Sequence, residues 1–285
     1  MRKFLVVAAA ALLLSAGTAH AADRPPQAHL YTPTTGGQVE VGEPVLVTGG
    51  GYDGYRADTL QDYQVSVDGG QTWDSGYRTG TVPLGGESGV TQALWAYVFT
   101  PQDPGVYTIV GRVNTDTAIG DPSAPRTLYV GVPAPTPGFI PGLCYQCGFH
   151  TEQPAVPVDE GLPLELGLRF RVDRPLSITH ISTWRNGETP SAVRLWRGDG
   201  TLLAALPNGG VFPTPVPVEP GVEYVASFTS PRGRYATTED VFPATVVKAP
   251  LVLPAHAGVY SYDGGFPTET WHDSHYWVSP LFQAR

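Results

Sequence analysis

Closely spaced glycine and proline residues constrain the fold of this chain more than any other feature of its sequence. There are 34 Gly and 29 Pro among 285 residues, and aromatic and β-branched residues fall in short runs between them. Such runs are typical of β-strands, and the residues between them favour tight turns. The sequence therefore predicts an all-β protein in which helices are almost absent.

The first 21 residues have the pattern of a secretory signal peptide. Arg2 and Lys3 precede an apolar run at 4–14, and the segment ends in Ala-His-Ala at 19–21. A charged start, a short apolar centre and small residues before the cleavage site form the export pattern. We expect a mature chain that begins at Ala22 and is exported to the periplasm or beyond, without a lipid anchor or a membrane span.

The charge of the chain argues against nucleic acid as a partner. Removing Arg2 and Lys3 from the 17 basic residues leaves 15 against 26 acidic ones, a net charge of −11. Lys248 is then the one remaining lysine. Phosphate binding needs clustered Lys and Arg, which this composition does not offer.

A Pro-rich segment predicts the boundary between two domains. It starts with Val-Pro-Ala-Pro-Thr-Pro-Gly, which is extended and poor in hydrogen-bond donors and suits a semi-rigid spacer. We expect a signal peptide at 1–21, an Ig-like β-sandwich at 22–131, a linker at 132–143 and a jelly-roll-like β-sandwich at 144–285. Each half is long enough to bury its own core.

Short runs at regular spacing predict the Ig-like sandwich of the first domain. The expected strands are 29–32, 39–47, 63–67, 93–100, 106–113 and 127–130. Motifs at 67–73, 94–97 and 104–108 resemble Ig-like domains of secreted bacterial enzymes, and are similar to the Ig-like dimerisation domain of sulfite-oxidase-type molybdenum enzymes. Without a molybdenum domain, this resemblance implies a spacer or pairing module that forms a homodimer, and not redox chemistry.

The stretch 66–73 also resembles the Asp-box of sialidase propellers, S-x-D-x-G-x-T-W. A propeller repeats this motif once per blade, whereas the sequence contains it once. We therefore expect a structural hairpin in which Asp68 caps the turn, Gly69 and Gly70 adopt positive φ, and Trp73 packs beneath.

The second half contains the clearest strand of the chain, at 164–172. Five apolar residues lie on one face of this strand, with Glu165, Arg169 and Arg171 on the other. Further runs that complete a jelly-roll-like sandwich are 176–184, 192–196, 201–206, 222–229, 234–237, 258–262 and 276–282.

From about Cys144 to Arg285 the chain resembles a bacterial domain-of-unknown-function family, found in exported proteins beside Ig-like modules and glycan-active domains. The motifs that carry this resemblance are ELGLRF at 165–170, VRLW at 193–196, GTLLA at 200–204, GVEYVAS at 221–227, GVY at 258–260 and YWV at 276–278. The sequence departs from the family pattern at 271–275, so a site there would be particular to this protein.

A carbohydrate site is predicted on the turn-rich stretch that follows residue 261. Tyr262, Phe266 and Trp271 offer flat apolar faces for a sugar ring, and Asp263 offers a carboxylate for its hydroxyls. Ordinary loop packing is the alternative for these rings. Aromatic residues within strands are instead expected in the core: Trp184, Trp196 and Trp277.

Two metal sites are hypotheses of the sequence. His272, Asp273 and His275 carry ligating groups on one irregular loop and favour Zn²⁺ or Cu²⁺, with surface histidines as the alternative. The expected source of a third imidazole is one of three residues: His150, His180 or His256. The second hypothesis is a calcium site formed by three aspartates: Asp53, Asp58 and Asp62. The alternative is that these aspartates lie in solvated loops.

Cys144 and Cys147 are predicted to form a structural disulfide, because lone cysteines outside the cytoplasm usually oxidise. His150 extends the pair to a C-x-x-C-x-x-H spacing, so zinc ligation is the alternative. A loop this short limits the stabilisation by a disulfide to about 2 kcal/mol.

The sequence carries no recognisable nucleophile elbow, P-loop or dinucleotide fingerprint. Carboxylates that a glycosidase could pair are present, but their separation is not readable from sequence: Glu239, Asp240, Asp263 and Glu269. We predict an exported, non-catalytic binding or adhesion protein for envelope or extracellular carbohydrate, with no required cofactor. The alternatives are a structural component that pairs with another envelope protein, and a weak hydrolase or metal-dependent enzyme built on the 272–275 loop.

Overall fold

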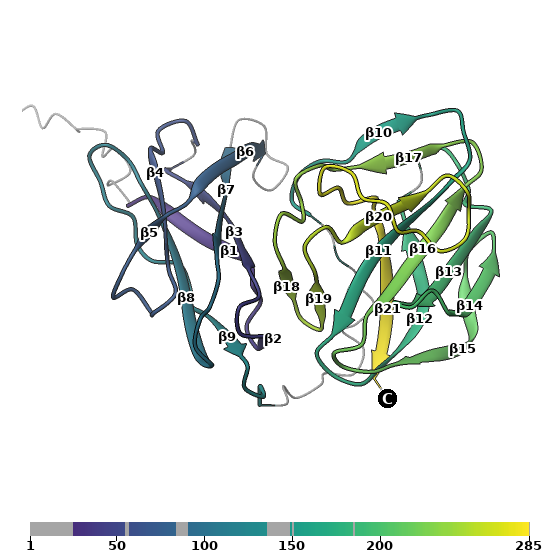
Figure 1. Ribbon diagram of the computed structural model, residues 1–285. Coiled ribbons are helices and arrows are strands. Elements are labelled where there is room, and N and C mark those ends of the chain that lie inside the picture. Colours follow the sequence, from purple (N-terminus) through teal and green to yellow (C-terminus); the bar gives the residue numbers. More distant parts are fainter. Residues whose placement is uncertain are drawn as a thin grey trace, which may run out of the picture.

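The computed structural model of the protein describes residues 25–54, 57–83, 91–135, 149, 151–184 and 186–284. Every regular element in these residues is a β-strand, and the strands form two sandwiches side by side (Figure 1). The all-β prediction is confirmed. The described residues contain no helix long and apolar enough to cross a membrane. The predicted signal peptide, most of the linker and the cysteine pair, Cys144 and Cys147, lie outside the described residues.

The first sandwich has the strand order of an Ig-like fold. One sheet follows the order β1 (Gln27–Thr32), β3 (Val45–Tyr52), β7 (Thr91–Phe99) and β6 (Tyr77–Pro83). The other follows the order β2 (Gly37–Val39), β9 (Arg126–Val130), β8 (Gly105–Asn114), β4 (Asp62–Ser66) and β5 (Asp74–Ser75). In the strand names of the Ig fold, strands A, B, E and D of one sheet are β1, β3, β7 and β6. Strands C, F and G of the other sheet are β4, β8 and β9, so the arrangement is that of an Ig fold.

A buried tryptophan explains one glycine in β3 and one in β8. Trp95 on β7 lies in the core between Gly49 on β3 and Gly111 on β8. A Cβ at Gly49 would lie 2.2 Å from Cζ2 of Trp95, and one at Gly111 would lie 2.6 Å from its Cη2. The glycines therefore provide the space that the indole ring occupies.

The strand predicted at 39–47 is wrong in its extent, because the chain turns within it. β2 ends at Val39 and β3 begins at Val45. Gly42 between them has a φ of +80°, and Pro44 has no N–H to donate to a strand ladder. The turn lets the two halves of the predicted strand enter opposite sheets.

The hairpin predicted at 66–73 is confirmed in its geometry. The Asp68 carboxylate accepts hydrogen bonds from the backbone N–H of Thr72 at 2.9 and 3.0 Å. Gly69 and Gly70 have φ of +77° and +97°. Trp73 donates its Nε1–H to the carbonyl of Gly70 at 3.1 Å.

The second sandwich packs a long sheet against a short one. The long sheet runs β14 (Leu202–Pro207), β13 (Ala192–Arg197), β16 (Tyr224–Ser230), β11 (Leu164–Val172), β19 (Leu251–Leu253) and β18 (Val246–Lys248), and β20 (Gly258–Ser261) also pairs with β11. The short sheet runs β15 (Val211–Val218), β12 (Leu176–Thr183) and β21 (Val278–Ala284), and β10 (Val156–Asp159) pairs with β17 (Arg234–Thr237) in a separate ribbon.

The alternation predicted for β11 is confirmed. Leu166, Leu168 and Phe170 are fully buried between the two sheets. Glu165 on the opposite face is also buried, and it accepts a hydrogen bond from Arg194 at 2.6 Å. A buried charge is tolerated when it is paired in this way.

The two sandwiches share part of a core. Val247 of β18 is buried among residues of the first sandwich, and a Cβ at Gly37 would lie 2.2 Å from its Cγ1. The backbone N–H of Leu46 donates to the carbonyl of Thr245 at 2.8 Å, and that of Thr34 donates to the carbonyl of Val247 at 3.0 Å. In Figure 1, β18 and β19 lie on the side of the second sandwich that faces the first.

Candidate functional site

Four neighbouring tyrosine rings form a series that extends from the core of the second sandwich to its surface. Tyr235 and Tyr276 are buried, Tyr260 is half-buried and the Tyr262 side chain is 49% exposed. Ring centroids lie 5.9 Å apart for Tyr235 and Tyr276, 6.4 Å for Tyr276 and Tyr260, and 5.5 Å for Tyr260 and Tyr262. Together with Glu160 and Glu269 these rings form what we call the tyrosine–glutamate surface.

Glu160 fixes two of the tyrosine hydroxyls. Tyr262 donates to its Oε2 at 2.7 Å and Tyr235 donates to its Oε1 at 2.5 Å. The hydrogen bond to Glu160, together with burial, raises the pKa of Tyr262 to about 12, so the phenol is neutral at physiological pH. Glu160 was missed from the sequence because it lies 102 positions from Tyr262, with no local pattern to mark it.

Glu269 lies directly opposite Tyr260. The two residues exchange backbone hydrogen bonds at 2.8 and 3.0 Å, and burial together with the Glu269 carboxylate raises the pKa of Tyr260. Tyr262 and Trp271 each follow this antiparallel pair by two residues, so the chain leaves the pair in opposite directions toward them. Tyr262 and Trp271 therefore lie on opposite sides of the Tyr260–Glu269 pair along the chain.

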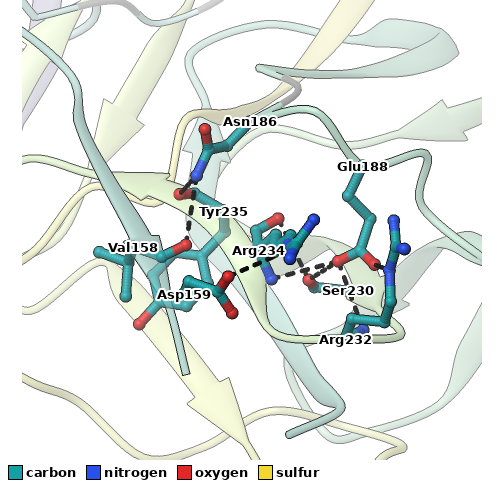
Figure 2. A network of polar contacts seen from close by, with 8 residues as sticks. All are labelled: Val158, Asp159, Asn186, Glu188, Ser230, Arg232, Arg234 and Tyr235. Carbon is teal, nitrogen blue, oxygen red and sulfur yellow. Dashed lines mark hydrogen bonds and ion pairs between the residues drawn. The ribbon is translucent and has the colours of Figure 1, made fainter. Parts of the chain in front are cut away.

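A polar network holds the β10–β17 ribbon that positions Glu160. Figure 2 shows the side chain of Asn186 donating to the carbonyls of Val158, at 3.2 Å, and Tyr235, at 3.1 Å. Arg234 and Asp159 form an ion pair at 3.0 Å across the same ribbon. These contacts fix the end of β10, from which Glu160 follows directly.

The aromatic residues predicted to bind carbohydrate divide into two groups. Trp271 is 55% exposed, and Asp263 is exposed at the tip of its turn. Phe266 is instead half-buried, with its ring centroid 5.7 Å from that of Trp196. The structure thus leaves Tyr262, Asp263 and Trp271 accessible to a ligand and uses Phe266 to anchor the loop.

The strand tryptophans also differ from one another. Trp196 is buried, as expected, and donates to Ser227 at 2.8 Å. Trp184 was expected in the core but is mostly exposed, and its ring lies 5.6 Å from that of half-buried Trp277. It follows the last residue of β12, where the sheet no longer covers it.

The polar side chains of the loop proposed as a metal site contact different partners. His272 stacks on Trp271 with centroids 4.2 Å apart, and its Nδ1 lies 3.1 Å from the Glu239 carboxylate. Asp273 instead contacts Nδ1 of His256. Both His272 and Asp273 have positive φ, of 44° and 49°, so the chain bends sharply here.

His275 turns into the core, away from His272. It is 0% exposed, with ring centroids 5.0 Å from Phe149 and 5.7 Å from Phe242. In the described ranges no three His, Cys, Asp or Glu side chains gather as they would around a metal ion. The zinc and calcium sites therefore stay predictions from the sequence, and the two loop histidines are not brought together.

Residues 151–278 match the family described as a domain of unknown function, DUF4082. The DUF4082 region starts ahead of β10 and ends at Val278 in β21. It contains every residue of the tyrosine–glutamate surface, together with the 271–275 loop. No curated protein matches the sequence.

Solved structures similar to the chain include fibronectin-type modules and a protein solved with an oligosaccharide. Fibronectin(III)-like modules of Clostridium thermocellum CbhA have 11% identity over 37% of this chain and 98% of theirs, with a TM-score of 0.26. Chicken CNTN1 FN1–FN3 domains have 13% identity over 92% and 67%, with a TM-score of 0.25. Bacteroides ovatus SGBP-B, solved with a mixed-linkage heptasaccharide, has 12% identity over 69% and 50%, with a TM-score of 0.18.

Proposed function

We propose that this protein is an exported, non-catalytic binding protein that holds carbohydrate on the tyrosine–glutamate surface of its second domain. The observation that carries the proposal is Tyr262, which is 49% exposed while its hydroxyl donates to Glu160 at 2.7 Å. An exposed ring that is already ordered loses little conformational entropy when a ligand stacks on it. The signal-peptide pattern at 1–21 supports export.

The groups around Tyr262 favour a neutral glycan chain over a single sugar ring. Trp271 provides a second exposed ring on the other side of the Tyr260–Glu269 pair, and the exposed carboxylates of Asp263 and Glu269 accept hydrogen bonds from sugar hydroxyls. Two exposed rings on opposite sides of the pair favour a ligand of more than one sugar unit. The acidic charge of the chain disfavours acidic glycans.

Retention of the mature chain on insoluble polysaccharides tests the proposal. We expect the protein to bind at least one member of a panel that contains cellulose, chitin, xylan and peptidoglycan. Trp271→Ala and Tyr262→Ala should each weaken retention about tenfold, which corresponds to about 1.4 kcal/mol. The melting temperature should stay close to that of the parent chain, because both side chains are largely exposed.

Tyr52→Ala is the matched control, because Tyr52 also holds a hydrogen bond, to Gln27 at 2.7 Å, but lies on the first sandwich. Its retention should equal that of the parent chain. The proposal would be contradicted if the Tyr52 and Tyr262 variants lost retention equally, or if the parent chain were retained on no polysaccharide. Release of soluble sugar from the bound polymer would show an enzyme instead.

A further inference from the structure

A cavity of about 460 Å³ lies between the two sandwiches, partly open to solvent. Its floor is the outer face of the β1-β3-β7-β6 sheet, where Leu46, Thr48 and Leu94 line it. Its roof comes from the second sandwich, from Phe149 and from residues within the segments 151–153 and 240–248. Cavities of this volume at domain interfaces are typical of small-molecule sites.

The walls of this inter-domain cavity are held in place by bonds between the sandwiches. Val247 is buried in the first sandwich, and the N–H of Ala249 donates to the Thr34 hydroxyl at 2.7 Å. Glu43 accepts hydrogen bonds from Thr245, at 2.8 Å, and from Arg171. The cavity is therefore a built feature of the molecule, so a ligand would find it already formed.

The charged side chains that line the inter-domain cavity have no net charge together. Arg78 and Lys248 are cationic, and Glu152 and Asp240 are anionic. Glu152 favours the charged form of Lys248, although burial outweighs it and lowers the pKa of that ammonium. A cavity without net charge offers no single-sign field to select an ion, but it offers many hydrogen-bonding groups.

The remaining lining combines hydroxyl groups with apolar surface. Burial and Glu152 raise the pKa of Tyr31 to about 12, and burial and Asp240 raise that of Tyr77, so both phenols stay neutral. Threonine side chains such as Thr48 and Thr79 and apolar side chains such as Leu94 also line the cavity. A ligand that matches this lining carries several hydroxyls, an apolar face and no charge.

We propose that the inter-domain cavity is a second binding site, which takes a neutral sugar of one or two rings. It shares no residue with the tyrosine–glutamate surface and does not depend on the function proposed for that surface. Both sandwiches contribute lining groups, so a bound sugar would bridge them. Lys248 at its wall lies 5.6 Å from the centre of the Phe149 ring.

The single lysine of the mature chain makes a direct test possible. Reductive methylation with isotope-labelled formaldehyde keeps the charge of Lys248 and places one side-chain reporter at the cavity wall, besides the N-terminal amine. The mature chain is titrated in turn with cellobiose, maltose and N,N′-diacetylchitobiose, and with anionic glucuronate and zwitterionic alanine as comparisons. We expect at least one neutral disaccharide to shift the Lys248 resonance saturably, and both glucuronate and alanine to leave it unchanged.

Two variants that narrow the cavity complete the test, Thr48→Trp and Thr79→Trp, each with its melting temperature measured to establish folding. Either one, when folded, should weaken the response about tenfold or more. Trp271→Ala should leave it unchanged, so a failure of the polysaccharide surface and a failure of the cavity are distinguishable. The proposal would be overturned if no neutral sugar shifted the Lys248 resonance, or if only alanine or glucuronate shifted it. It would also be overturned if neutral sugars shifted the resonance equally well in the folded tryptophan variants.

Discussion

Glu188 shows how a single residue is buried and still ionised. Its Oε2 accepts hydrogen bonds from the Ser230 hydroxyl at 2.6 Å and from the backbone N–H groups of Arg232 and Arg234 at 3.3 and 3.1 Å, and its Oε1 accepts from Arg232 Nε at 2.8 Å (Figure 2). Burial raises its pKa, but these hydrogen bonds outweigh that effect and hold the pKa below the ordinary value of 4.5. The charged form therefore stabilises the fold.

Glu188→Gln is expected to lower the free energy of unfolding at pH 7 by about 2 kcal/mol, because an amide presents a donor to groups that themselves donate. The stabilisation from a carboxyl with a depressed pKa is complete above about pH 4.5 and is lost as the pH falls through the folded-state value. Denaturant unfolding from pH 7 to pH 3 should therefore show the two proteins converging in acid.

Asp159→Asn is the control for this residue, since its ion pair with Arg234 is exposed on both sides and should contribute at most about 1 kcal/mol. A difference between parent and Glu188→Gln that stays constant from pH 7 to pH 3 would contradict the role assigned to the carboxylate.

At the scale of elements, the loop after β20 depends on one ring for its place. Phe266 packs against Trp196, beside Val225 and Val259, on the outer face of the long sheet. Phe266→Ala should lower the free energy of unfolding by about 2 kcal/mol, less than for a fully buried ring, because Phe266 is half-buried. Backbone hydrogen exchange should speed up at 262–271, because the loop loses its anchor.

Leu162→Ala is the matched truncation, because Leu162 is an exposed apolar side chain in a turn of the same sandwich. It should change neither stability nor exchange measurably. Unchanged exchange at 262–271 in Phe266→Ala would mean that other contacts hold the loop, and would return Phe266 to the set of candidate ligand-binding rings.

At the scale of the whole molecule, Val247 joins the two sandwiches. Because this residue of β18 is buried in the first sandwich, heating should unfold both sandwiches in one calorimetric transition. Val247→Ala should lower the free energy of unfolding by about 2 kcal/mol. Val247→Asp places a charge in that core and should separate the transition into two, since each sandwich also has its own core.

Val211→Asp is the control, because Val211 is a largely exposed valine on β15. It should keep the single transition. Two transitions in the parent chain would show that the sandwiches unfold independently, and that the contacts of β18 add little to their stability.

Local patterns in the sequence determined the class of fold, the two faces of 164–172 and the turn capped by Asp68, because strand alternation and turn chemistry depend on residues close in the chain. Packing between sheets decided the rest. Glu160 and Tyr262 meet although 102 positions separate them, and Val247 enters a core formed by the other half of the chain. Such contacts arise only after distant strands have taken their order, so no local periodicity or spacing records them.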